Sequence, residues 1–197
     1  ASCQPNFAIL STDGYWNGNV GRQTNNSTSI GNQDNTDTPP YSLQSQGVYD
    51  GGTPVASNTL ADVALYYYKT DLRPLLADTV PTTNKDTAGH QHMVTFTIGL
   101  GLDGELTFRP DYEAAGSGDF YDIKQGTKKW PVPSAEQPTA LDDLWHAAVN
   151  GRGQYFNAGD PSTLAQGLTT ALAQIDAQSG SGSGAAASTL QPVMGDN

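Results

Sequence analysis

Basic residues are scarce in this sequence. It holds 9 Lys and Arg against 20 Asp and Glu, which gives a formal net charge of -11. A nucleic-acid partner is therefore excluded, because nothing on such a surface would replace the counterions of a phosphate backbone. The chain is rich instead in Asp, Asn, Ser and Thr, with 22 Gly and 12 Pro. This composition is typical of oxygen-rich loops, which suit hard cations better than soft ones.

Cysteine and long apolar runs are also nearly absent. Cys3 is the one cysteine, so it is either a free thiol or half of a bridge to sequence outside this chain. No window approaches the ~20 apolar residues of a membrane span, and Ala1 does not open a secretory leader. We therefore expect no membrane-spanning helix. With 197 residues, one domain is the prior expectation.

The motifs of common enzymes are missing or out of context. There is no GxSxG elbow, and Cys3 has no histidine near it in sequence. GLGLDG (Gly99–Gly104) matches GxGxxG, but the residues after it look extended and Pro110 breaks them. A dinucleotide site needs a helix at that point, so we favour a glycine-rich turn.

Three histidines form a second possible site. His90 and His92 could hold a metal together with His146. No Cys or Glu stands at ligand spacing near them, and His146 falls on an expected helix. An enzyme that uses these histidines or the Gly99–Gly104 turn is therefore kept only as a minor alternative.

Three short segments predict β-strands. Residues 6–12 read NFAILST, a continuous apolar run typical of a strand buried on both faces. Residues 92–101 are rich in β-branched side chains and end in glycines, and residues 153–159 form a third run.

Three longer segments predict helices. In residues 56–72, Ser57 or Asn58 can cap a helix whose apolar stripe is Leu60, Val63, Ala64 and Tyr67. Thr139 and Asp142 resemble a capping box before a helix stopped by Gly151. Asp160 followed by Pro161 begins the last helix, with one apolar face formed by Leu164, Leu168, Leu172 and Ile175.

The remaining segments have no clear period. Residues 18–57 predict a long loop insertion, and residues 102–138 an irregular excursion with short strand pieces that decorates the domain. The domain is expected to span 1–178, because residues 179–197 have the Gly-, Ser- and Ala-rich composition of a linker.

The alternation of strands and helices predicts an α/β fold. We expect an open, mostly parallel, Rossmann-type sheet with helices on both faces. Three strands make a poor domain, and residues 6–12 would present an unpaired apolar edge. We interpret the chain as the second half of a doubly wound domain that lacks its first strands.

Asp13 is the main candidate site residue, because ligands of open α/β sheets sit at the carboxyl ends of strands. It follows the strand 6–12 directly and precedes Gly14. One reading is an Asp-Gly turn. The other is a Mg²⁺ or Ca²⁺ ligand, which needs about five further oxygens from elsewhere. The segment NQDNTD (residues 32–37) has the side-chain oxygens of a calcium loop, but it lacks the required glycine and distal Glu.

Four motifs in order resemble a known family. They are CQPNFAILSTDGYWNG, SNTLADVALYYYKTDLRP, HQHMVTFTIGLGLDG and LDDLWHAAVNGRGQYFNAGDPSTLAQGL. Together they resemble the PilY family of type IV pilus biogenesis factors and tip-associated adhesins. The resemblance implies an N-terminal domain similar to von Willebrand factor A, then a linker and a β-propeller. This chain matches the second half of the A-like domain, so the missing N-terminal half of that domain is an expected partner.

The resemblance also implies a role and a site. Members act at the pilus tip or outer membrane, outside the cell, with minor pilins and the pilus machinery as partners and host or surface ligands as targets. A-type domains hold a divalent cation with a DxSxS motif, a later Thr and a late Asp. Asp13 matches the late Asp, with Thr12 beside it, whereas DxSxS is absent and DPSTL at Asp160 fits a helix cap better.

The leading hypothesis is therefore a non-enzymatic adhesion and pilus-assembly module, with a Mg²⁺ or Ca²⁺ site completed from outside this chain. A purely structural scaffold without metal is the alternative.

Overall fold

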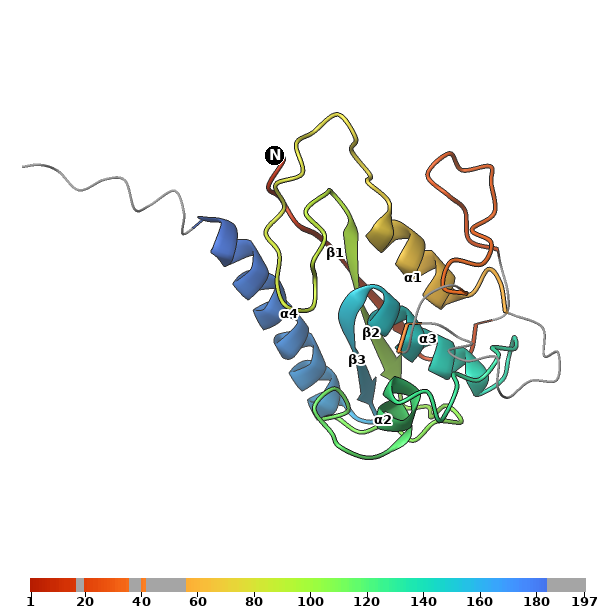
Figure 1. Cartoon of the computed structure of the whole chain (residues 1–197). Helices are drawn as coiled ribbons and strands as arrows, with labels where there is room; N and C mark the ends of the chain where they lie inside the picture. The colour runs from red at the N-terminus through yellow and green to blue at the C-terminus, as the bar shows by residue number, and fades with distance from the viewer. Residues whose placement is uncertain (17–19, 36–39, 42–55, 184–197) are drawn as a thin grey trace, which may run out of the picture.

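The computed structural model describes residues 1–16, 20–35, 40–41 and 56–183, with backbone alone for residues 180–183 (Figure 1). Three parallel strands form its sheet in the order β1-β2-β3. They are β1 (Asn6–Thr12), β2 (Met93–Leu100) and β3 (Arg152–Ala158). The three predicted strands are confirmed, and so is their parallel arrangement. Neighbouring parallel strands need a long crossover connection, and both crossovers in this sheet contain helical segments.

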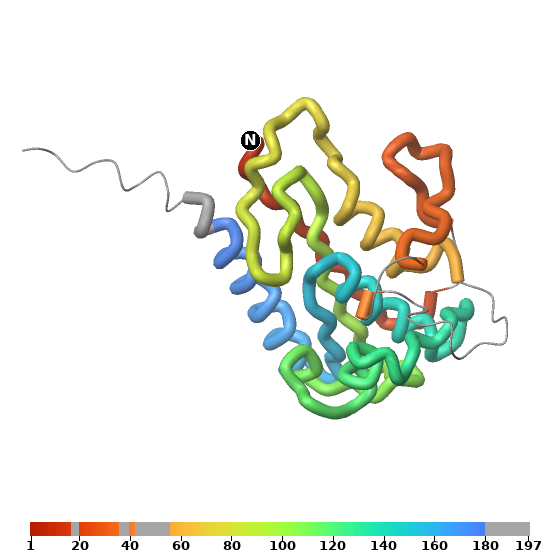
Figure 2. The backbone as a smooth tube through the Cα atoms, viewed as in Figure 1, coloured from red at the N-terminus to blue at the C-terminus, as the bar shows by residue number. Residues whose placement is uncertain are grey.

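Helices cover both faces of this sheet, as predicted. They are α1 (Leu60–Lys69), α2 (Asp119–Lys124), α3 (Thr139–Asn150) and α4 (Pro161–Ser183). Figures 1 and 2 show α1 and α3 on one side of the strands and α4 on the other. On the first side, Thr97 Oγ1 donates to the carbonyl of Leu144 at 2.8 Å. On the second, Val94 and Phe96 pack with Ala171. None of the described helices combines the length and apolarity needed to cross a bilayer.

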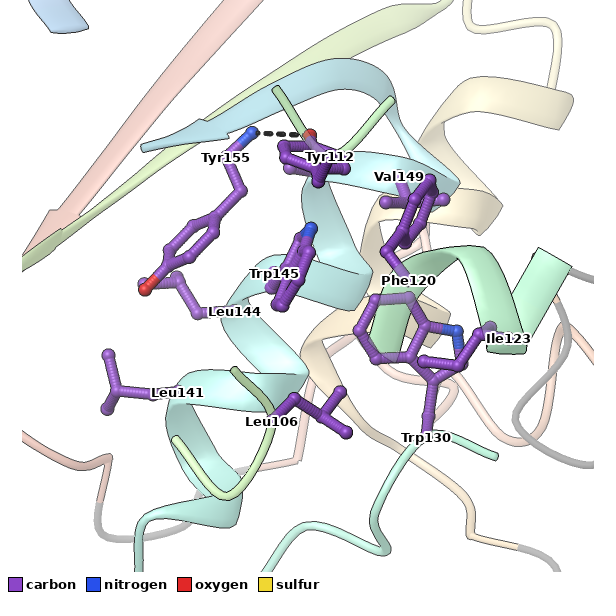
Figure 3. Close-up of a cluster of buried hydrophobic side chains, with 11 residues drawn as sticks. Leu106, Tyr112, Phe120, Ile123, Trp130, Leu141, Leu144, Trp145, Val149 and Tyr155 are labelled. Atoms are coloured by element: carbon purple, nitrogen blue, oxygen red, sulfur yellow. Dashed lines mark hydrogen bonds between the residues drawn. The ribbon is translucent and has the colours of Figure 1, made fainter. Parts of the chain in front are cut away.

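The segment 102–138 is part of the core, so the prediction that it only decorates the domain is wrong. Trp145 of α3 lies at the centre of a buried cluster (Figure 3). Its ring stacks on Phe120 at 5.8 Å between centroids and meets Tyr112 edge-on at 5.0 Å. The segment supplies five buried members of this cluster: Leu106, Tyr112, Phe120, Ile123 and Trp130. No strand forms in this segment; its one regular element is α2.

The N-terminal half of α3 anchors two distant segments through adjacent carboxylates. Asp142 accepts the backbone N–H groups of Glu105 and Leu106, at 2.9 and 3.1 Å. Asp143 accepts those of Leu60 and Ala61, at 2.8 and 3.1 Å. The predicted capping box of Thr139 and Asp142 is therefore wrong. The helix begins after Pro138 with no side-chain cap, because the Asp142 carboxylate is used by the excursion instead.

The cap of α1 also differs from the prediction. Thr59, not Ser57 or Asn58, is the N-cap, and it forms a capping box with Asp62. Asn58 instead accepts the N–H of Gly31 at 2.8 Å, which ties the 20–35 segment to the start of the helix.

The buried face of α1 is rotated from the predicted stripe. It consists of Ala61, Ala64, Leu65 and Tyr68. The opposite side lies under the 20–35 segment, where the Tyr67 hydroxyl donates to the carbonyl of Arg22 at 2.9 Å. Both sides of α1 are thus covered, so the apolar pattern alone did not single out the face toward the sheet.

The two edge strands of the sheet differ in how far other parts of the chain cover them. At β3, the N–H of Tyr155 donates to the Tyr112 hydroxyl at 3.1 Å, and Lys85 Nζ donates to the carbonyl of Gly153. On β1, Ile9 and Leu10 remain 39% and 41% exposed, so this strand is not buried on both faces as its sequence suggested. No strand of the described residues pairs with its outer side. β1 is an open edge.

Helix α4 extends past the point where the sequence predicts the end of the domain. It begins where predicted, because Asp160 Oδ1 accepts the N–H groups of Ser162 and Thr163 at 2.7 and 3.1 Å. It continues to Ser183. Its predicted apolar face is partly wrong, since Leu172 is 55% exposed and the buried positions are the small residues Gly167 and Ala171. Residues 184–197 lie outside the described part.

Candidate functional site

The carboxyl ends of the three strands meet at one edge of the sheet. The strand register aligns Thr12 with Gly99, and Gly99 with Asn157, in one row across this edge. Asp13 follows Thr12, and Asp103 joins the row through its carboxylate, which accepts the Asn157 Nδ2–H at 2.8 Å. Polar side chains from all three strand ends therefore gather at the position where open α/β sheets bind ligands.

Asp13 and Thr12 play different parts here. Thr12 Oγ1 donates to the carbonyl of Gly14 at 2.9 Å and accepts its N–H at 3.2 Å, so the hydroxyl closes the turn. Asp13 is exposed, and its carboxylate makes no hydrogen bond or ion pair to any described residue. The turn expected for Asp13-Gly14 is thus present, and the carboxylate itself is available to a ligand.

The described residues do not complete a cation site. They contain no group of three or more His, Cys, Asp or Glu side chains placed to hold a metal. A hard cation takes about six oxygens, whereas this edge offers the carboxylate of Asp13 and the already engaged groups of Thr12 and Asp103. Metal binding at Asp13 therefore requires ligands from outside the described residues and stays a prediction.

The histidines lie elsewhere and are engaged. His90 and His92 precede β2 at the opposite end of the sheet, with ring centroids 5.5 Å apart. His92 Nδ1 lies 2.7 Å from the carbonyl of His90, and its Nε2 lies 3.0 Å from Asp86 Oδ2. With both ring nitrogens of His92 occupied, neither is free to bind a metal or to activate a nucleophile.

His146 does not join this pair. It is buried in α3 and stacks on Trp130, with 4.5 Å between ring centroids. Its Nε2 donates to the carbonyl of Tyr41 at 2.7 Å. Burial lowers the pKa of His146 to about 3, so the ring is neutral and its 3.3 Å contact with Asp34 is not an ion pair.

The two loop motifs are structural as well. After Leu100 the chain forms turns rather than a helix, so Gly99–Gly104 is not a dinucleotide fingerprint. Gly104 packs so tightly that an added Cβ would lie 2.1 Å from Asp142 Oδ1. In the calcium-loop candidate, Asn32 Oδ1 accepts the N–H of Asn35, and Asp34 accepts Asn150 Nδ2 at 3.1 Å. Residues 36 and 37 of that motif lie outside the described part.

Buried aspartates are the feature that the sequence reading missed. Five are nearly inaccessible to solvent: Asp34, Asp62, Asp86, Asp142 and Asp143. Burial raises the pKa of Asp143 to about 7, although it accepts two backbone N–H groups. No local pattern reveals Asp34, Asp142 and Asp143, because their partners are 36 to 116 residues away in the chain. Cys3, in contrast, is exposed and has no disulfide partner within this chain.

Comparison with known proteins finds three curated relatives with similar sequences. The chain is 38% identical over 194 residues to the type IV pilus biogenesis factor PilY1 of Pseudomonas aeruginosa strain PAK. This chain resembles PilY1. The PilY1 proteins of strains PAO1 and UCBPP-PA14 match at 38% over 196 residues and 33% over 205 residues. The resemblance predicted from the four motifs is thereby confirmed.

The match covers most of this chain but a small part of each relative. It includes 88% of the chain and 16% of the PilY1 of strain PAK. No protein-family model matches the chain. No solved structure matches it either, so the likeness to von Willebrand factor A stays a prediction.

Proposed function

We propose that this chain is a non-enzymatic module of a type IV pilus biogenesis protein that acts in pilus assembly and adhesion outside the cell. The observation that carries the proposal is the match to three PilY1 proteins along 88–92% of the chain. Internal hydrogen bonds support a scaffold role. They engage His92, His146 and Asp142, so the described residues present no assembled catalytic group. The expected partners are minor pilins and other parts of the pilus machinery.

The open edge of β1 supports the proposal that another part of the same protein completes the sheet. Ile9 and Leu10 stay exposed there, and a bare apolar edge invites pairing with another strand. Hydrogen exchange tests this. The amides of β1 that point away from β2 should exchange fast in this chain and at least about tenfold more slowly in the whole protein. Equal exchange in both would contradict completion of the sheet at β1.

Asp13 is the proposed contribution of this chain to a Mg²⁺ or Ca²⁺ adhesion site. Its support is its place at the carboxyl edge and its exposed carboxylate without an internal partner. The test is calorimetric titration of the whole protein with each cation, beside Asp13→Ala and Asp78→Ala. Asp78 is a matched control, because it is an exposed loop aspartate outside the carboxyl edge.

We expect Asp13→Ala to reduce the affinity by about tenfold or more, because a carboxylate ligand is lost. Asp78→Ala should titrate like the unaltered protein. Equal heats for all three proteins would remove Asp13 from any metal site and leave the metal-free scaffold as the better account.

A further inference from the structure

A cavity of about 260 Å³ lies between the end of β3, the first turns of α4 and the segment around Phe108. Figures 1 and 2 show these three parts side by side at the lower end of the molecule. No lining residue carries a charge, in a chain with 9 basic and 20 acidic residues. Six of the residues that line it are Phe108, Gln154, Phe156, Asn157, Gln166 and Thr170.

Two phenylalanine rings form the apolar part of the lining. Phe108 is half-buried and held edge-on against Tyr155 and Trp145, with centroids 5.1 and 5.5 Å apart. Phe156 is half-buried beneath α4, where a Cβ added to Gly167 would lie 3.2 Å from it. Because the core holds both rings, they offer a fixed apolar surface to an occupant.

The polar part of the lining can both donate and accept. Gln154 Oε1 accepts Gln174 Nε2–H at 2.6 Å, which leaves its own amide N–H groups as donors. Asn157 uses Nδ2 toward Asp103 at 2.8 Å, which leaves Oδ1 as an acceptor. Gln166 and Thr170 make no side-chain hydrogen bond to other described residues, so both kinds of group are available from α4.

We infer that this cavity binds a neutral sugar ring. Each sugar hydroxyl both donates and accepts, which matches carboxamide and hydroxyl side chains, and the C–H face of the ring packs on aromatic surfaces. An uncharged lining offers no counter-charge to an anionic or cationic ligand. Ligand pockets of drug-sized molecules begin at about 300 Å³, so the occupant is one ring, free or at the end of a glycan. This site is separate from Asp13 and needs no metal.

The test is a nuclear magnetic resonance titration of the labelled whole chain with D-glucose, D-galactose, D-mannose and N-acetyl-D-glucosamine. A chelator is present throughout. We expect at least one of these sugars to shift the side-chain amide signals of Gln154, Asn157 and Gln166 in a saturable way. Galacturonate and glucosamine, which carry a charge, should leave the signals unchanged. Absence of any saturable shift, or equal shifts with the charged sugars, overturns the inference.

Variants on one helix make the test specific. Gln166→Ala combined with Thr170→Ala should weaken binding about tenfold, because two hydrogen bonds are lost. Both positions are exposed and have no partner among the described residues, so the fold should persist. Thr169→Ala is the matched control, since the Thr169 hydroxyl donates to the carbonyl of Ala165 and does not line the cavity. Binding by the double variant at unchanged affinity would also refute the inference.

Discussion

His92 and Asp86 form a buried pair, with His92 Nε2 3.0 Å from Asp86 Oδ2 and each side chain 1% exposed. Burial lowers the pKa of His92, but the hydrogen bonds to Asp86 and to the carbonyl of His90 outweigh it, so the pKa is raised above 6.5. A raised histidine pKa contributes stability that is fully present below pH 6.5 and is lost as pH rises through the folded-state value.

This pair predicts a pH-dependent effect of Asp86→Asn. The stability advantage of the unaltered chain over the variant should be largest in mild acid and should shrink as the pH rises above 6.5. Urea unfolding at several pH values between about 5 and 9 measures it. Asp78→Asn, at an exposed loop position, is the control. A constant difference across this range would show that the charge on His92 does not contribute.

Asp143 stabilises the fold in its neutral form, whereas His92 does so in its charged form. Its pKa is raised from 3.8 to about 7, chiefly by burial. The carboxyl group therefore supports the fold best when protonated, below pH 3.8, and its contribution falls as the pH rises toward 7. Over that interval the advantage of the unaltered chain over Asp143→Asn should decrease by roughly 2 to 4 kcal/mol. Urea unfolding along the same pH series measures it, and a flat difference would contradict it.

Phe120→Ala should destabilise the whole domain, because Phe120 belongs to the cluster around Trp145 (Figure 3). We expect a loss of about 3 to 5 kcal/mol in the free energy of unfolding. Val132→Ala is the control, because Val132 lies in the same segment but is 43% exposed. Chemical denaturation followed by tryptophan fluorescence gives both values. Equal small losses would restore the view that residues 102–138 only decorate the domain.

Leu10→Lys should reduce self-association of this chain, because a charge on a bare sheet edge opposes strand pairing. Sedimentation velocity at rising protein concentration measures the effect. Leu75→Lys serves as the control, since Leu75 is 99% exposed and lies outside the sheet. If both variants associate alike, general surface hydrophobicity and not the β1 edge is responsible.

The strands and the layered arrangement were predictable because their signals are local. The run NFAILST and the β-branched residues around Phe96 each contain the whole pattern of a strand. Alternation with helices then determines a parallel sheet. The position of Asp13 at the carboxyl edge follows from the same pattern and needs no contact information.

The core and the buried carboxylates were not predictable, because they depend on pairs that are distant in sequence. Phe120 and Trp130 reach Trp145 from a segment with almost no periodic element, so no window of residues reveals their burial. Asp142 looks like a capping residue locally, and only the arrival of Glu105 and Leu106 gives it another role. Asp86 and His92 are close in sequence, but an irregular loop separates them.

The anchoring role of α3 has a consequence for how the chain acquires its structure during synthesis. The N–H groups of Leu60 and Ala61 find their acceptor in Asp143, and those of Glu105 and Leu106 find theirs in Asp142. Both acceptors are made later than the groups they receive. The first two thirds of the chain therefore leave the ribosome with these donors still bound to water. The contacts that anchor the earlier segments to α3 can therefore be completed only after α3 has been synthesised.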